Sequence, residues 1–239
     1  MADDLTDIFA NRPATANRPL LGLTVLVVED SRFASEAMRL LCLRSGARIR
    51  RADCLRSAHR HLQTYRPGVV IIDMGLPDGS GADLVAEVRA MTPPSPVIIG
   101  TSGDPDGEPL AMAAGADAFL GKPLESLSVF QQAILSALPL AGRPPGLHLV
   151  PDEQITPDPL ALRDDLSHIA AVLADAPNLA ALDYIAQFLS GIARSAHDLP
   201  LEDAAAALAR ARRVGPGAAP DLRRLSGLVQ SRLASGASF

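Results

Sequence analysis

The sequence predicts a doubly wound α/β fold, with a parallel sheet between two layers of helices, followed by an all-α region. Three apolar runs without polar alternation indicate strands buried on both faces, at residues 23–28, 69–73 and 96–101. Segments of helical periodicity separate them, so that strand and helix patterns alternate five times over residues 21–140. From residue 159 onward only helical patterns remain.

Each predicted element follows from local signals. The strand at 23–28 runs into Glu29, Asp30 and Ser31, where Asp30 or Ser31 can cap a helix that stops before Gly46. In chain order, the expected elements after that strand are a helix at 32–45, a weak strand at 47–50, a helix at 54–65, the strand 69–73, a helix at 81–91, the strand 96–101, a helix near 107–114, a short strand within 117–123 and a helix at 124–138. Pro105 and Pro109 predict that the helix near 107–114 starts late or is short.

The composition restricts the class of protein. Hydrophobic residues make up 48% of the 239 residues, enough for aliphatic cores, and the formal net charge of −5 argues against binding nucleic acid through overall charge. Cys42 and Cys54 lack metal-ligand spacing and indicate a reducing compartment. The acidic N-terminus lacks a signal-peptide core, and there is no apolar run of about 18 residues, so we expect a cytoplasmic protein with no membrane contact.

Polar side chains follow the predicted strands at their carboxyl ends. Glu29 and Asp30 follow the first apolar run, Asp73 ends the second, Thr101 ends the third, and Lys122 follows the last short strand. Ligands of open α/β sheets bind in the crevice at the carboxyl ends of the strands. We therefore expect one crevice to collect all five side chains.

The residue types in this crevice point to phosphate chemistry. Carboxylates gathered in a partly dry site repel one another unless a cation is present, and oxygen ligands suit Mg²⁺. Lys122 is the only lysine among the 22 basic residues. Together with the hydroxyl of Thr101, its ammonium group completes a site suited to a phosphoryl group. Asp73 is then placed to act as the nucleophile that accepts it.

Four stretches of residues 21–140 stand in a characteristic order and spacing: VLVVEDS, VVIIDMGLPDGSGADLVAEVR, PVIIGTSG and DAFLGKPL. In these stretches the segment resembles the receiver domain of two-component response regulators. The resemblance implies a flavodoxin-like, five-stranded parallel sheet and Asp73 as the phosphoacceptor. It also implies that Asp30 is a direct Mg²⁺ ligand, that Glu29 acts partly through water, and that Gly75 supplies a backbone carbonyl.

The same resemblance assigns the switching residues. It makes Thr101 the hydroxyl that moves toward the phosphoryl group, Lys122 the contact of the phosphoryl oxygens, and Phe119 the switch aromatic. Pro123 falls at the usual cis-proline position of the family. The two prolines near residue 107 place in doubt the helical face that receivers commonly use to pass on their state.

The composition divides the chain into four parts. We expect a flexible tail at 1–20, the receiver at 21–140, a linker at 141–158 and a helical region at 159–239. The stretch 138–159 holds six prolines and two glycines, which favours a stiff, extended connection. Four helices are expected after it, at 159–175, 178–197, 201–213 and 219–235, and short connections favour a four-helix bundle.

A second resemblance concerns the helical region. The stretch YIAQFLSGIARSAHDLPLEDAAAALARA is similar to the central helices of histidine phosphotransfer (HPt) domains. Aligned on Gly191, the position of the phosphorylated His is Gln187 and the position of the following Lys is Ser190. The resemblance implies a degenerate HPt domain, while any alanine-rich bundle helix can imitate the pattern. His168 and His197 remain candidates for phosphorylation, but both lack the Lys-Gly context, and we expect them to be surface or capping residues.

These observations favour a response regulator that accepts a phosphoryl group on Asp73 and signals through protein–protein contacts of its helical region. Self-catalysed phosphorylation and dephosphorylation aside, we do not expect an enzyme, since no catalytic constellation stands in the second half. The expected partners are a histidine kinase or a phosphotransfer protein, and homodimerisation is left open. A DNA-binding transcriptional regulator is the alternative. Residues 151–239 hold 8 basic and 11 acidic residues and no basic recognition helix, which argues against nucleic acid.

Overall fold

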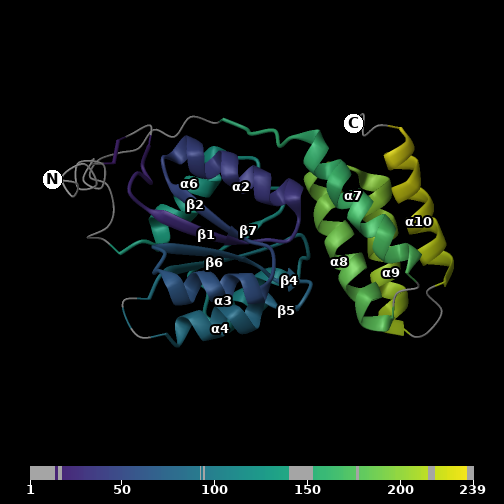
Figure 1. Cartoon of the computed structure of the whole chain (residues 1–239), viewed down its shortest axis with the longest axis horizontal. Helices are drawn as coiled ribbons and strands as arrows, with labels where there is room; N and C mark the ends of the chain where they lie inside the picture. Colours follow the sequence, from purple (N-terminus) through teal and green to yellow (C-terminus); the bar gives the residue numbers. More distant parts are fainter. Residues whose placement is uncertain are drawn as a thin grey trace.

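The computed structural model of the chain describes residues 14–15, 18–91, 93, 95–139, 153–175, 178–214 and 219–235. Within them, a five-stranded parallel sheet has the order β2-β1-β3-β6-β7. Its strands are β1 (Thr24–Val28), β2 (Arg48–Ala52), β3 (Val69–Asp73), β6 (Val97–Ser102) and β7 (Ala118–Gly121). The flavodoxin-like doubly wound sheet predicted from the sequence is thereby confirmed (Figure 1).

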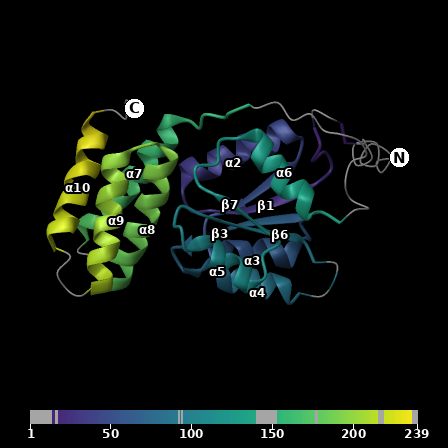
Figure 2. The same ribbon diagram turned by 180° about the vertical axis from the view of Figure 1, so that it is seen from behind.

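Helices cover both faces of the sheet (Figures 1 and 2). One layer consists of α2 (Arg32–Ser45) and α6 (Leu127–Ala137), and the other of α3 (Leu55–Thr64), α4 (Gly81–Arg89) and α5 (Gly107–Ala114). Successive side chains of a strand alternate between these layers, so that Val25 and Val27 join one apolar core and Leu26 and Val28 join the other. All four are fully buried, which explains why the central strands show no polar alternation.

The loops at the carboxyl ends are set by caps and turns. Ser31 is the N-cap of α2, since its hydroxyl accepts a hydrogen bond from the backbone N–H of Ala34. Gly46 ends that helix in the left-handed conformation, with φ of 84°. The expected turn after Asp73 is a small antiparallel hairpin, β4 (Gly75–Leu76) and β5 (Gly79–Ser80), which the sequence did not predict. The helix expected near 107–114 begins at Gly107, after Pro105, as predicted.

Two boundaries drawn from the sequence need correction. Leu20, placed in the flexible tail, is fully buried, and its backbone N–H donates to Ser45 O at 3.0 Å. The last part of the expected linker, from 153, packs on the receiver: Ile155 lies in the core next to α6, and the backbone of Gln154 pairs with Ser126. The side chain of Ile155 and the pairing of Gln154 with Ser126 therefore hold this segment on the receiver, although its prolines favoured an extended linker. Residues 1–13, 16–17 and 140–152 lie outside the described residues.

The C-terminal part is helical, as expected. It contains α7 (Pro159–Ala174), α8 (Leu179–Ser195), α9 (Leu199–Val214) and α10 (Ala219–Ala234). We call these helices the helical region. They share one apolar core, to which Leu166, Ile185, Leu208 and Leu225 contribute fully buried side chains. No helix in the described ranges has both the length and the apolar character needed to cross a membrane.

Candidate functional site

The carboxyl ends of the parallel strands bring the predicted side chains together. Asp73 and Thr101 are direct partners in the register of β3 and β6, and Met74 N donates to Thr101 O at 3.0 Å. Glu29 is held next to β2, because its backbone N–H donates to Ala52 O. Lys122 follows β7, and its backbone N–H donates to Ser102 O at 3.0 Å. Four separate strand ends thus build one crevice, as the sequence predicted.

Three carboxylates face one another in this crevice. Glu29, Asp30 and Asp73 each offer an oxygen, and these oxygens lie within 4.8 Å of one another. The ammonium of Lys122 lies 2.9 and 2.8 Å from the two oxygens of Glu29, and 3.2 Å from Oδ2 of Asp73. Glu29, Asp73 and Lys122 are less than 9% exposed. The single lysine of the chain is therefore the cation that this acidic group contacts directly.

Burial governs the protonation of the group. Desolvation raises the pKa of Asp73, although the charge of Lys122 opposes this effect. Desolvation, followed by the neighbouring charge of Asp73, raises the pKa of Asp30 to about 7. Burial alone would lower the pKa of Lys122, but the charges of Asp73 and Glu29 outweigh it, so the pKa of the ammonium is raised. One cation thus faces three carboxylates, and the crevice favours taking up a proton or a second cation.

The donor set fits a divalent ion. Oδ1 of Asp30 and Oγ1 of Thr101 are buried and accept or donate no hydrogen bond within the described residues. Buried polar atoms normally have partners, so two orphaned oxygens beside a carboxylate cluster indicate that ligands complete the site. Glu29, Asp30 and Asp73 provide the hard oxygen ligands that Mg²⁺ prefers. The backbone carbonyl of Gly75 stays a predicted ligand, implied by the resemblance. The hydroxyl of Thr101 is next to Asp73, where the resemblance places the switch residue.

The remaining predicted residues lie around the crevice. Phe119 is half-buried, and its ring packs against β6, since a Cβ added to Gly100 would lie 3.2 Å from the ring. Gly75 directly follows Met74 at the crevice, and its backbone N–H hydrogen bonds to the carboxylate of Asp73. The Lys122–Pro123 peptide bond is cis, as predicted.

Side chains of the helical region also contact the crevice residues, although no local sequence pattern predicted these contacts. The hydroxyl of Tyr184 on α8 donates to Oδ2 of Asp30 at 2.7 Å. The amide of Gln187 lies so close to Gly75 that a Cβ added there would be 2.4 Å from it. His168 is exposed and packs edge-on against Phe188, as expected for a surface residue.

His197 is exposed as well and pairs with Glu125, with 2.8 Å between Nε2 and Oε1. Its φ of 54° places it at the turn between α8 and α9. Both histidines were kept as candidates for phosphorylation, and neither contacts Asp73 in the described part of the chain.

Comparisons with known proteins agree with this geometry. Residues 25–134 match the family model described as the response regulator receiver domain. The KDP operon transcriptional regulatory protein KdpE of Escherichia coli is 29% identical over 99 residues, covering 41% of this chain and 44% of that protein. The probable transcriptional regulatory protein TcrX of Mycobacterium tuberculosis is 34% identical over 102 residues, covering 42% of this chain and 44% of that protein.

Solved structures are similar to about half of this chain. The CheY-like response regulator receiver domain from Methylobacillus flagellatus is 25% identical, with a TM-score of 0.45, and the match covers 48% of this chain and 98% of that one. The matches with KdpE and TcrX span less than half the length of those relatives. Residues 25–134 form a response regulator receiver domain. The family match ends at residue 134, before the helical region begins.

Proposed function

We propose that the chain is a response regulator whose Asp73 accepts a phosphoryl group from a histidine kinase or a phosphotransfer protein, in a reaction that depends on Mg²⁺. The observation that supports this most is the convergence of Asp73, Asp30, Glu29, Lys122 and Thr101 at one edge of a receiver sheet. A cytoplasmic location is part of the proposal, since it is where such donors carry their phosphoryl groups.

The crevice residues divide the work of the transfer. An oxygen of Asp73 attacks the phosphorus, the P–N bond to the donor imidazole breaks, and the imidazole leaves with the bonding electron pair. Lys122 neutralises negative charge on the phosphoryl oxygens, and the Thr101 hydroxyl, which has no partner in the resting state, turns toward one of them. Glu29, Asp30, Asp73 and the Gly75 carbonyl hold Mg²⁺, which supplies further charge neutralisation when bound.

The phosphoryl group then shifts a two-state element. Thr101 and Phe119 are the residues through which this bias is passed on, because one faces the crevice and the other packs on the same strand. We propose that the receiver begins at the buried Leu20 and receives the input, and that residues 159–239 form the output. Homodimerisation through the output region stays within the proposal.

We further propose that the helical region is a degenerate HPt domain. The alignment made from the sequence puts Gln187 where the phosphorylated His of an HPt domain stands. In support, Gln187 is the α8 residue that lies against Gly75 beside the phosphoacceptor. Glutamine cannot carry a phosphoryl group as histidine does, so the region is a binding module rather than a phosphate carrier.

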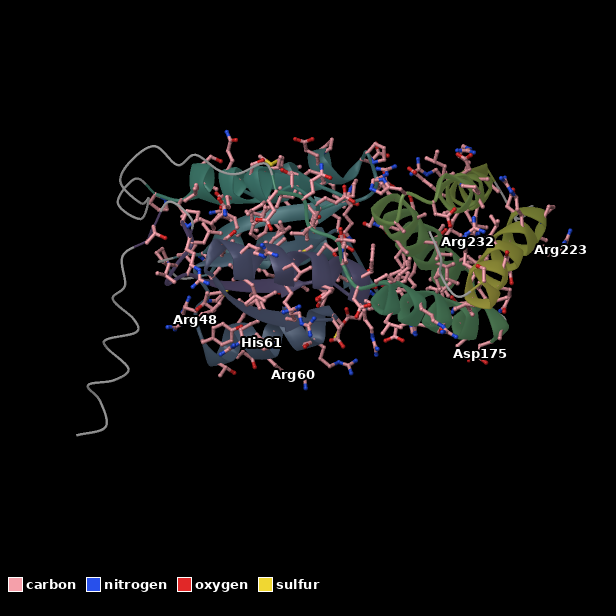
Figure 3. All side chains as sticks on the ribbon, turned by 90° about the horizontal axis from the view of Figure 1, so that it is seen from above. Arg48, Arg60, His61, Asp175, Arg223 and Arg232 are labelled. Carbon is pink, nitrogen blue, oxygen red and sulfur yellow. The ribbon has the colours of Figure 1, made fainter. Side chains whose placement is uncertain are left out.

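A transcriptional role is the second candidate, and the names of KdpE and TcrX as transcriptional regulators favour it. Both matches cover less than half of this chain, so they do not identify the function of the helical region. On α10, Arg223 is exposed and points away from the rest of the molecule (Figure 3). Salt-dependent binding of the full chain to duplex DNA supports this candidate, and lack of binding at low salt removes it.

The phosphoacceptor assignment is tested with acetyl phosphate and Mg²⁺. The variant Asp73→Asn should lose all incorporation of a phosphoryl group, because the amide lacks the nucleophilic oxygen, and intact-protein mass spectrometry measures this directly. Asp78→Asn is the matched control, since Asp78 is an exposed carboxylate on the same loop that caps α3 through Leu55 N and Arg56 N. Labelling of Asp73→Asn at the same site rules out the assignment.

A further inference from the structure

The helical region lies beside one end of the receiver sheet (Figures 1 and 2). Side chains of α8 reach from there to the crevice that contains Asp73. Helix α7 packs against α2, and α8 contacts both α2 and β4. The interface joins residues that are far apart in the sequence, so it did not follow from any local pattern. Its polar contacts include one group around Asp165 and another along α8.

Asp165 anchors α7 on the N-terminus of α2. Its carboxylate accepts hydrogen bonds from the Ser31 hydroxyl at 2.8 Å, from Arg32 N at 2.8 Å and from Phe33 N at 3.0 Å. The residue is 3% exposed, and both of its oxygens have partners. A carboxylate is favoured at a helix N-terminus because the first backbone N–H groups there lack partners within the helix. This contact fixes the helical region to the loop that follows Asp30.

Helix α8 then closes the mouth of the crevice. Tyr184 occupies one oxygen of Asp30, and Gln187 lies on Gly75. One turn further on, the backbone of Gly191 packs on the receiver: a Cβ added to Gly103 would lie 2.9 Å from its Cα. Arg194 donates to the carbonyl oxygen of Gly103. Asp30 and Gly75, two of the residues that would hold Mg²⁺, are thus both in contact with α8.

The space left at Asp73 is too small for a phosphoryl group. The cavity lined by Asp73, Lys122, Gln187 and Gly191 has a volume of about 10 Å³, which is the lower limit for a single water molecule. A phosphoryl group brings a phosphorus atom and three oxygens, each about as large as a water. Two larger cavities of about 710 and 650 Å³ reach Asp30, but Asp73 lines neither of them.

We propose that the α8 face formed by Tyr184, Gln187 and Gly191 is an internal competitor of the phosphodonor. It covers the receiver surface on which a phosphohistidine-bearing protein must dock, so transfer to Asp73 requires the helical region to leave. The inference rests on the proposed phosphoacceptor function. In-line transfer puts the leaving nitrogen beyond the phosphorus, on the side opposite Asp73, and α8 fills that space.

Competition has a reciprocal consequence. A phosphoryl group on Asp73 excludes the docked arrangement. Docking in turn slows phosphorylation, because the observed rate is the rate of the undocked molecules multiplied by the fraction of molecules that are undocked. Phosphorylation therefore exposes the α8 face for a partner. The docked interface therefore covers two binding surfaces. The phosphodonor binds the receiver side, and the partner of the phosphorylated chain binds the α8 side.

Gly191→Leu tests this inference. A Cβ at Gly191 would already be in van der Waals contact with Lys122, 3.8 Å from its Cδ and Nζ, and the cavity beside it has a volume of only about 10 Å³. The further carbon atoms of a leucine should therefore push the helical region away from the receiver. Leucine favours the helix more than glycine does, so α8 itself is preserved. Gly227→Leu on α10 is the matched control, because a Cβ there meets nothing within 4 Å. The double variant Asp165→Asn, Tyr184→Phe undocks the region without adding bulk.

The measurement is the initial rate of labelling by acetyl phosphate and Mg²⁺, with circular dichroism to confirm folding. We expect Gly191→Leu and the double variant to be labelled at least about tenfold faster than the unaltered chain, and Gly227→Leu at the unaltered rate. Equal labelling rates in all four proteins overturn the competition and leave the phosphoacceptor function standing. Absence of labelling in all four overturns the phosphoacceptor function, and the inference with it.

Discussion

Two buried carboxylate sites lie on either side of Ser31, and they are built on opposite principles. Asp165, from the helical region, is fully satisfied, with both oxygens hydrogen bonded to the start of α2. The crevice group is incomplete, since Oδ1 of Asp30 and Oγ1 of Thr101 have no partner in the described part of the chain. The comparison shows how to separate an anchor from a ligand site: in an anchor the protein satisfies its own charges, and in a ligand site it does not.

The largest effect that separates the sites should come from removing the cation of the crevice. Lys122→Met leaves Glu29 and Asp73 buried without their ion pair, which should reduce the free energy of unfolding at pH 8 by about 3–5 kcal/mol. Urea unfolding measures the change. Arg89→Met is the control, because its pair with Asp117 is partly exposed and should contribute only about 0–1 kcal/mol. Millimolar Mg²⁺ should restore stability to Lys122→Met, and failure to do so contradicts a cation site there.

The second effect is a pH dependence confined to the crevice. The pKa of Asp30 is raised to about 7, so below that pH the carboxyl is protonated and Mg²⁺ must displace the proton to bind. We expect the apparent Mg²⁺ affinity to fall roughly tenfold per pH unit below about 7 and to level off above it. Isothermal titration calorimetry measures this, and Asp30→Asn should weaken binding and flatten the profile. A constant affinity in the unaltered chain between about pH 6 and 8 is the opposing result.

The anchor should respond more weakly. Asp165→Asn removes the charge that faces the N-terminus of α2 and weakens three hydrogen bonds, so we expect a loss of about 2 kcal/mol in unfolding free energy. Asp78→Asn, which caps the start of α3 from an exposed position, should lose about 0.5–1 kcal/mol. Equal losses at the two helices mean that Asp165 is an ordinary cap rather than an anchor between regions.

The receiver could be predicted from the sequence because its signals are local. Buried strands show as apolar runs, and the strand ends place Asp73, Thr101 and Lys122 without any knowledge of long-range packing. Ser31 was one of two predicted caps, with Asp30, because both precede the helix. The β4–β5 hairpin was missed because Gly75 and Gly79 resemble any loop, and two-residue strands carry no periodicity. Leu20 was missed because the short Leu20–Leu21 pair, between Pro19 and Gly22, shows no strand or helix periodicity.

The contacts between the two regions could not be predicted from one sequence. Tyr184 and Asp165 look like ordinary helix residues, and only the fold places them beside Asp30 and Ser31, more than 130 residues earlier in the chain. The burial of Ile155 in the receiver core could not be predicted either, since the prolines around it favour an extended linker. Gln187 is the exception: the alignment on Gly191 marked it from sequence alone, because the spacing within a helix fixes which residues share a face.

The central claim is that the docked helical region and a phosphoryl group on Asp73 exclude each other. Small-angle X-ray scattering of the full chain, before and after labelling with acetyl phosphate and Mg²⁺, tests it most directly. We predict that the radius of gyration increases on labelling, and that Asp73→Asn treated in the same way stays unchanged. A fully labelled chain whose scattering curve matches that of the unlabelled chain contradicts the claim.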